Sequence, residues 1–162
     1  MVDSKVKKQV RDLYHRALKE DDNQNHEEAM KLIDQAIALM PSDTALWSAR
    51  AQFRYDKKDY ADAEVDAESA IERDEKNLHA WGLLGQIKAH TGHFEEAAAC
   101  YKKSLQLSED KGLYTLLAAV EYEFDLPSAI RHARKALKLD PSWDEAQKIL
   151  DAAQDELKKR EK

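Results

Sequence analysis

The residues best suited to chemistry in this chain are two histidines and a cysteine near its middle. His90 and His93 flank a Thr-Gly pair, and Cys100 follows seven residues after His93. Zinc binds imidazole and thiolate, but a zinc site needs four converging protein ligands, or three and a water molecule. Because no further ligand stands at a suitable spacing, we interpret the histidines as turn residues and Cys100 as either a small, half-buried residue or an inert surface residue. We predict no metal site.

Paired carboxylates are the other candidates for chemistry. Glu27–Glu28 and Glu95–Glu96 stand where helices are expected to start, and acidic side chains there complement the helix dipole. The sequence contains no nucleophile elbow, phosphate-binding loop or dinucleotide fingerprint, and its four glycines are too scattered for a glycine-rich loop. We therefore predict no catalytic residue and no cofactor, and expect that the protein is not an enzyme.

Composition and charge indicate the class of protein. The chain has 162 residues, of which 36% are charged, with only four glycines and three prolines, and good helix formers are abundant. The net charge of −6 disfavours nucleic-acid binding. The sequence has neither an apolar run of about 20 residues for a membrane span nor a signal-peptide core, and a single cysteine suits a reducing compartment. We expect a cytoplasmic protein, with the nucleus as an alternative, that binds neither membrane nor nucleic acid.

A pattern of small and aliphatic residues recurs four times along the chain. Its first small residue is Ala29, Ala63, Ala97 and Ala129 in successive copies, at steps of 34, 34 and 32 residues. Seven residues later a second small residue recurs, and an aliphatic residue follows it directly. These pairs are Ala36–Ile37, Ala70–Ile71, Ser104–Leu105 and Ala136–Leu137. Such a period indicates a repeat architecture.

The segments that precede two of the copies also correspond. Trp47 aligns with Trp81, Ala51 with Gly85, and Tyr60 with Phe94. A 34-residue unit with these positions resembles the tetratricopeptide repeat, in which each unit is a helix–turn–helix. The resemblance implies an all-α fold, a right-handed α-solenoid of stacked antiparallel helix pairs. We expect one domain over residues 1–162, with repeats at about 8–41, 42–75, 76–109 and 110–141 and a capping helix at 142–160.

Several local details follow from this pattern. Asn25 with Glu28, and Ser142 with Glu145, have the spacing of capping boxes, and Pro127 indicates the first turn of a helix. The first helix of repeat four fits two registers. We favour the register that buries Leu113, Leu116, Leu117, Val120 and Phe124, and the alternative turns Tyr114, Leu117 and Ala118 inward. The capping helix carries an apolar stripe, Trp143, Ala146, Ile149, Leu150, Ala153 and Leu157.

The acidic stretch Asp56–Asp74 belongs to the second repeat. We expect Ala63, Ala67 and Ala70 to face the neighbouring helices. The acidic residues should then lie on the outer, solvated side of that helix, with a docking patch for a basic partner as the alternative; they are Asp62, Asp66, Glu68, Glu72 and Asp74.

The family resemblance also implies a binding surface. In tetratricopeptide proteins the first helix of each repeat lines a concave groove that usually binds a segment of a partner protein. The residues carried over to that groove are Tyr14, Ser48, Ala49, Gln52, Tyr55, His79, Leu83, Gln86 and His90. Arg11, Leu18 and Ala45 extend this set, and either Tyr114 or Tyr122 extends it into repeat four.

Repeat two resembles repeats of co-chaperones, many of which bind the C-terminal carboxylates of the 70- and 90-kDa heat-shock proteins. Such proteins use a clamp of Lys, Asn, Asn, Lys and Arg, because a carboxylate needs charge-assisted donors. The equivalent positions here are Tyr14, Leu18, Ala49, His79 and Leu83, none with a fixed positive charge. We expect the carboxylate clamp to be absent.

Two classes of function remain. The first is an adaptor, a non-catalytic protein-interaction module whose groove binds a peptide or helical segment of another protein. The second is an assembly or scaffold module that self-associates or docks in a larger complex. Binding of heat-shock-protein tails is the third possibility. We expect a monomer, with a homodimer as the alternative.

Overall fold

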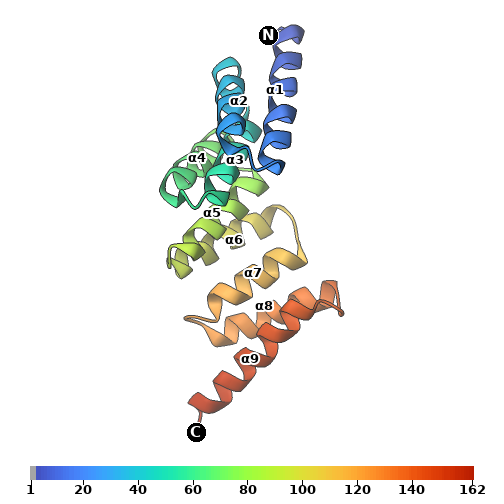
Figure 1. Ribbon diagram of the computed structural model, residues 1–162. Helices are drawn as coiled ribbons and strands as arrows, with labels where there is room; N and C mark the ends of the chain where they lie inside the picture. The colour runs from blue at the N-terminus through green and yellow to red at the C-terminus, as the bar shows by residue number, and fades with distance from the viewer. Residues whose placement is uncertain (1–2) are drawn as a thin grey trace. The chain divides into compact units, whose positions relative to one another are not determined.

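The computed structural model describes residues 3–162, and all regular secondary structure in that range is α-helical (Figure 1). Short turns join the helices into consecutive pairs, followed by one more helix. The helices are α1 (Ser4–Asp22), α2 (His26–Leu39), α3 (Thr44–Asp56), α4 (Tyr60–Arg73), α5 (Leu78–His90), α6 (Phe94–Leu107), α7 (Lys111–Glu121), α8 (Leu126–Leu139) and α9 (Asp144–Arg160). None of the helices in residues 3–162 is long and apolar enough to cross a membrane.

The chain forms two compact units, Met1–Leu83 and Leu84–Lys162. The division falls inside α5, so the first unit ends partway along that helix. In the first unit α1 packs on α2, α2 on α3, and α3 on α4. In the second unit α6 packs on α7, α7 on α8, and α8 on α9. The single domain expected over residues 1–162 stays a prediction.

The turns inside the first three helix pairs repeat the same backbone geometry. Gln24, Lys58 and Gly92 have φ angles of 61°, 65° and 81°, and they are separated by the same interval as Ala29, Ala63 and Ala97. In each turn the amide of the next residue donates to the carbonyl five residues before it, at 2.8–2.9 Å. This bond and the left-handed residue together define a Schellman-type helix end. The period of the sequence is therefore also a period of the backbone.

Two tryptophans occupy equivalent positions in successive repeats. The indole Nε1 of Trp47 donates to the carbonyl of Pro41, and that of Trp81 donates to the carbonyl of Glu75, both at 2.9 Å. Each bond ties the start of a first helix to the loop before it. Burying an indole requires a partner for its N–H group, and here the loop backbone supplies that partner.

The core of the first unit lies between α1, α2 and α3. Its buried members include Val10 and Leu13 from α1, Ile33 from α2, and Leu46 and Phe53 from α3. On α4, the three alanines expected to face inward, Ala63, Ala67 and Ala70, are all fully buried. Small side chains at these positions let neighbouring helices approach closely, as the sequence predicted.

The second unit also depends on close packing. A Cβ atom added to Gly85 of α5 would lie 2.5 Å from Cε1 of Tyr101 on α6. Tyr101 is itself buried, so the absence of a side chain at position 85 makes room for its ring. On the capping helix, Ala146, Leu150 and Ala153 of the expected stripe are buried against α7 and α8.

The register that we favoured for the first helix of repeat four is wrong. In α7, Leu116 is 36% exposed, and Phe124, just after the helix, is 42% exposed. The alternative residues Tyr114, Leu117 and Ala118 are buried instead. Tyr114 can turn inward because its hydroxyl donates to Oε1 of Glu109 at 2.9 Å, while its ring stacks on His132.

Neither predicted capping box forms. Asn25 precedes α2 without a side-chain cap, and its amide donates instead to Oε2 of Glu20. At the start of α9 the residue in the cap position is Trp143, which makes no side-chain cap. The hydroxyl of Ser142, the predicted cap, donates to Asp140 instead. Pro127 does lie in the first turn of α8, as predicted.

Candidate functional site

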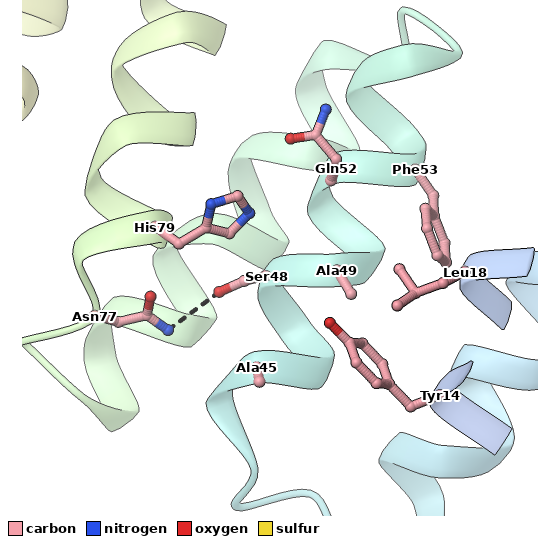
Figure 2. A pocket seen from close by; sticks show the side chains of 9 residues that line it. All are labelled: Tyr14, Leu18, Ala45, Ser48, Ala49, Gln52, Phe53, Asn77 and His79. Carbon is pink, nitrogen blue, oxygen red and sulfur yellow. Dashed lines mark hydrogen bonds between the residues drawn. The ribbon is translucent and has the colours of Figure 1, made fainter. Parts of the chain in front are cut away.

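The first unit contains a pocket of about 460 Å³ between α1, α3 and the start of α5 (Figure 2). Its size falls in the range usual for small-ligand and side-chain pockets, roughly 300–1,000 Å³. The residues that line it are Tyr14, Leu18, Ala45, Ser48, Ala49, Gln52, Phe53, Asn77 and His79.

One side of the pocket is apolar. Tyr14 and Leu18 stand one turn apart on α1, and Ala49 and Phe53 stand one turn apart on α3. In Figure 2 the two pairs lie next to each other, on the side of the pocket opposite Asn77 and His79. The ring of Tyr14 lies flat along this side, and its hydroxyl points toward α3. That hydroxyl has no hydrogen-bond partner within residues 3–162. It is therefore a donor and acceptor that a bound segment can use.

The other side of the pocket is polar. The Asn77 amide donates to Oγ of Ser48 at 3.1 Å, and its oxygen accepts from the amide of Ala80 at 3.0 Å. Ser48 in turn donates to the carbonyl of Thr44. These bonds connect the start of α5 to the middle of α3 and fix the pocket wall. His79 is exposed next to this wall.

The pocket wall carries no fixed charge. None of its nine lining residues is Asp, Glu, Lys or Arg. Gln52 donates its amide to Asp56 at 2.9 Å, one turn further along α3 and outside the lining. Without a fixed positive charge in its wall, the pocket lacks the charge-assisted donors that hold a terminal carboxylate. Apolar contact and neutral hydrogen bonds are what this site offers a ligand.

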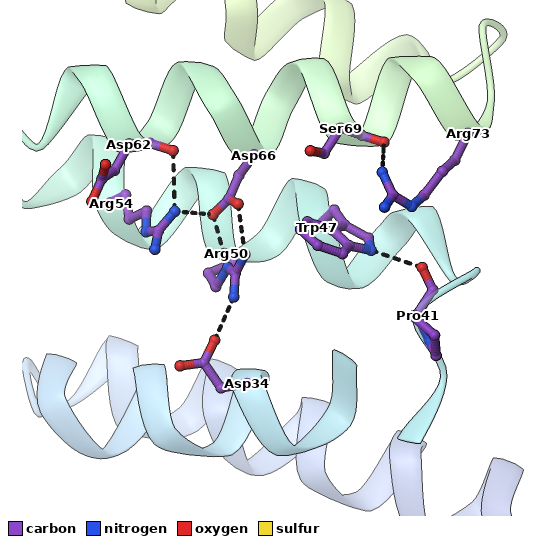
Figure 3. Close-up of polar contacts among 9 residues, drawn as sticks. All are labelled: Asp34, Pro41, Trp47, Arg50, Arg54, Asp62, Asp66, Ser69 and Arg73. Carbon is purple, nitrogen blue, oxygen red and sulfur yellow. Dashed lines mark hydrogen bonds and ion pairs between the residues drawn. The ribbon is translucent and has the colours of Figure 1, made fainter. Parts of the chain in front are cut away.

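Charged side chains behind the pocket fix the position of α3 (Figure 3). Arg50 donates two bonds to the carboxylate of Asp66 on α4, at 2.8 and 2.7 Å, and a third to Asp34 on α2, at 2.6 Å. Arg54, one turn further on α3, donates to the same carboxylate at 2.7 Å. A bidentate arginine–carboxylate pair is geometrically specific as well as strong. The network therefore connects three helices at a defined rotation of α3.

The expectation that Asp66 lies on the solvated side of α4 is wrong. Its exposed fraction is 1%, whereas Asp62, Glu68, Glu72 and Asp74 are exposed as expected. A buried carboxylate is stable only when it is paired and hydrogen-bonded. Arg50 and Arg54 provide that pairing from two successive turns of α3.

Trp47 lies beside this network. The guanidinium carbons of Arg50 and Arg73 lie 4.9 and 4.3 Å from the centroid of its ring (Figure 3). Arginine over the face of an indole is a favourable cation–π arrangement. Arg73 also donates to the carbonyl of Ser69 on its own helix. Trp47 is thus held by its ring faces and by its N–H group, and it connects α3 to the end of α4.

The structure brings five of the nine predicted groove residues together, because Tyr14, Ser48, Ala49, Gln52 and His79 all line the pocket. The predicted extensions Leu18 and Ala45 line it too.

The other four predicted residues lie elsewhere. Tyr55 is near the end of α3, with its ring centroid 5.6 Å from that of Tyr60. Leu83 is 1% exposed, so it offers almost no surface to a partner. Gln86 and His90 belong to the second unit. Arg11, from the wider set, lines a smaller recess of about 190 Å³ beside α1.

Sequence reasoning missed two lining residues, Phe53 and Asn77. Phe53 stands four residues after Ala49, so the helical period of α3 would have placed it on the same face. Asn77 stands directly before α5, in a position where asparagine favours a helix start. Both signals were present in the sequence, but neither residue follows from the family's groove positions.

The residues first considered for metal chemistry do not converge. Among residues 3–162, no group of three or more His, Cys, Asp or Glu side chains could hold a metal ion. His93 precedes α6 and its Nδ1 lies 2.9 Å from the hydroxyl of Thr91, inside the turn. Cys100 is a buried free cysteine on α6.

Comparison with known proteins agrees with the repeat geometry. The tetratricopeptide repeat family model matches residues 54–120. The chain thus contains tetratricopeptide repeats within residues 54–120. It is 29% identical over 149 residues to the small glutamine-rich tetratricopeptide repeat-containing protein 2 of Saccharomyces cerevisiae, a match that covers 92% of this chain and 41% of that protein. The chain therefore spans less than half the length of this relative.

Solved structures of tetratricopeptide proteins share the fold. One is YrrB, described as a protein with an unusual peptide-binding site; it has a TM-score of 0.79 at 18% identity, over 92% of this chain and 78% of that chain. Another is the first tetratricopeptide domain of Spaghetti (RPAP3) bound to the HSP90 peptide SRMEEVD; it has a TM-score of 0.70 at 21% identity, over 75% of this chain and 95% of that chain. At these identities the likeness concerns the fold alone.

Proposed function

We propose that this protein is a non-catalytic protein-interaction module that binds a segment of a partner protein in the pocket between α1, α3 and the start of α5. The observation that carries the proposal is the neutral pocket with one apolar side, lined by Tyr14, Leu18, Ala49 and Phe53. Peptides bound to proteins of the same fold support it. The proposed contact set is the pocket lining.

The chemistry of the pocket defines the segment it would accept. An aliphatic or aromatic side chain fits against Tyr14, Leu18 and Phe53. A backbone carbonyl or a neutral polar group beside that side chain can accept from the Tyr14 hydroxyl. Because the lining has no charged residue, a terminal carboxylate or a phosphate gains nothing over a neutral group there.

Filling the pocket from its rim tests the proposal. Ala45 is exposed and lines the pocket, so Ala45→Trp should fill the space without disturbing the core. Ala61→Trp, at an exposed position on α4, is the matched control. We expect those peptides selected on the wild-type protein from a random display library that lack Asp and Glu to bind Ala45→Trp at least tenfold more weakly, and Ala61→Trp unchanged. Equal binding to both variants would show that segments dock elsewhere.

The heat-shock-protein tail is a separate question with its own experiment. Fluorescence anisotropy can compare the synthetic peptide SRMEEVD with the same peptide carrying a C-terminal amide. Because the clamp positions Tyr14, Leu18, Ala49, His79 and Leu83 carry no fixed positive charge, we expect both forms to bind equally weakly. A tenfold preference for the free carboxylate would contradict this expectation.

A further inference from the structure

The outer face of α8 carries a row of positive charge. Arg131, Arg134, Lys135 and Lys138 are all exposed, and their spacing of three, one and three residues places them on one side of the helix. The helix from Leu126 to Leu139 contains no acidic residue. In a protein with a net charge of −6, this is a local excess of four positive charges.

The equivalent helices of the other repeats differ in charge. Helix α2 has three acidic residues and one lysine, and α4 has five acidic residues and one arginine. Helix α6 has two of each sign. Since all four helices follow the same repeat pattern, the fold does not require the charge of α8. A helix face that only contacts solvent could carry side chains of either charge.

The cations of α8 form no ion pair within residues 3–162, although Asp125, directly before the helix, lies within electrostatic reach of Arg131. No ion pair involves Arg131, Arg134, Lys135 or Lys138 there. Arg131 donates to the hydroxyl of Ser128 on its own helix, and Nζ of Lys135 lies 5.2 Å from the centroid of the Tyr114 ring. By contrast, Lys31 and Lys148, on α2 and α9, each pair with a carboxylate one turn away. The carboxylate-binding capacity of α8 is therefore unused.

An apolar strip runs beside the row. Pro127 and Ile130 line a recess of about 330 Å³ together with the four cations. Pro127, Ile130 and Arg134 also line a second recess of about 470 Å³, whose other wall is formed by Gln154, Leu157, Lys158 and Glu161 of the C-terminal segment. The two recesses share three residues. They therefore adjoin each other, and this pair of recesses, called the hollow below, offers apolar contact next to arginine and lysine.

We propose that this face of α8, defined by Pro127, Ile130, Arg131, Arg134, Lys135 and Lys138, binds a short acidic segment of a partner protein. An apolar side chain of the segment would enter the hollow, and its carboxylates would contact the cations. Arginine can bind a carboxylate through two parallel hydrogen bonds, so Arg131 and Arg134 can each bind one carboxylate in this way. From Arg131 to Lys138 the row extends about 10 Å along the helix, the length of about three extended residues.

Charge favours a short protein segment over larger anions. At physiological ionic strength exposed charges act over about 8 Å, so a short segment meets mainly the cations of α8. A nucleic acid or a second copy of this protein would also bring its negative charge near the exposed acids of the chain, whose net charge is −6.

The test separates this face from the pocket of the first unit. A random peptide display library is selected in parallel on the wild-type protein, on Arg134→Glu/Lys138→Glu, and on Lys5→Glu/Lys8→Glu. Lys5 and Lys8 are exposed on α1, so the last variant has the same change in net charge at another place. Ala45→Trp, which fills the other pocket, is the fourth protein.

We expect a class of peptides with two or more Asp or Glu residues around an aliphatic or aromatic residue. This class should bind the wild type, Lys5→Glu/Lys8→Glu and Ala45→Trp alike, and should lose at least tenfold in affinity on Arg134→Glu/Lys138→Glu. Anisotropy should show its affinity falling as NaCl rises from about 50 to about 300 mM. Loss of this class on Ala45→Trp as well would assign it to the other pocket and overturn the proposal.

Other occupants give distinct results. Two further probes are a short DNA duplex and vesicles of phosphatidylcholine and phosphatidylserine in equal parts. If either bound the wild type but not Arg134→Glu/Lys138→Glu, and no acidic peptide did the same, the proposal would be overturned. Sedimentation velocity tests the second copy, and we expect the wild type to be monomeric. A dimer that this double variant abolishes would assign the face to self-association instead. Peptides that lose affinity on Arg134→Glu/Lys138→Glu without carrying acidic residues would also overturn the proposal.

Discussion

Three residues at the ends of first helices adopt the left-handed backbone conformation, and only one of them is glycine. Gln24, Lys58 and Gly92 have positive φ angles at the same point of successive repeats. A residue with a Cβ atom is strained there by roughly 1–2 kcal/mol. The hydrogen bonds of the helix end hold Gln24 and Lys58 in this geometry. Two of the three turns therefore store strain that the third avoids.

Exchanging glycine at these positions should change stability in opposite directions. We expect Lys58→Gly to raise the free energy of unfolding by about 0.5–1 kcal/mol, because relief of strain exceeds the added chain entropy. Gly92→Ala should lower it by about 1 kcal/mol; no atom lies within 4 Å of the added Cβ, so backbone strain alone acts. Urea unfolding measures both. Lys57→Gly, at a φ of −78°, is the control and should not stabilise.

Gly85 presents the opposite case, in which space rather than backbone strain requires glycine. An added Cβ would lie 2.5 and 2.7 Å from two ring carbons of Tyr101, and that ring is buried. We expect Gly85→Ala to lower the free energy of unfolding by about 1–3 kcal/mol, as overpacking does. In a Tyr101→Leu background the same substitution should cost less, since the clashing ring is gone. Equal costs in the two backgrounds, measured by urea unfolding, would argue against this contact.

At the scale of the helix, buried carboxylates connect elements that apolar residues alone would leave free to rotate. Asp66 joins α4 to α3, and Glu121 joins α7 to α6 and α8 through Lys102 and His132. The periodicity of α4 did place Asp66 on the inner stripe, since it lies three residues from Ala63 and four from Ala70. Its acidic character led to the opposite prediction. A sequence shows which face of a helix a residue occupies more reliably than whether a side chain of opposite charge lies beside it.

Glu121 makes the stability of the second unit depend on pH. Burial raises the pKa of its carboxyl, but the bond to His132 at 2.5 Å and the contact with Lys102 at 2.8 Å outweigh it and lower the pKa below the ordinary value of 4.5. A lowered folded-state pKa adds stability above the unfolded value, and that stability is lost as the pH falls through the folded value. The ring of Tyr114 stacks on His132, the residue that is bonded to Glu121.

Replacing the carboxylate by its neutral isostere should expose this dependence. We expect Glu121→Gln to melt below the wild type at every pH above 4.5, and the difference in Tm to shrink as the pH falls below 4.5. Glu123→Gln, at an exposed position two residues away, is the control and should follow the wild type. Circular dichroism melts between pH 3 and pH 7 give the comparison. A Tm difference that stayed constant over this range would mean that Glu121 acts through packing instead of charge.

At the scale of the whole chain, the sequence predicted the repeat and failed at its irregularities. The spacing of Ala29, Ala63 and Ala97 predicted the first three helix pairs, because the same packing recurs wherever the repeat length is unchanged. Repeat four is shorter by two residues, and there the favoured register of α7 was wrong. The pocket followed from the family's groove positions only in the first unit. The boundary at Leu83 falls inside an uninterrupted helix, so no local signal marks it.

Repeat proteins are stabilised by contacts between neighbouring repeats. A destabilising substitution at one end of the chain should therefore affect mainly the helices next to it. Leu150 of α9 is buried against α8 with Ala133 and Ala153, and Leu150→Ala should lower the free energy of unfolding by about 2–5 kcal/mol. We expect hydrogen exchange, followed by mass spectrometry, to show faster amide exchange in α8 and α9, while α1–α4 keep wild-type protection. Leu139→Ala, a half-exposed leucine of α8, is the matched control and should change little. Faster exchange spread evenly over α1–α9 would instead show that the two compact units unfold as one, because a purely local loss cannot reach α1.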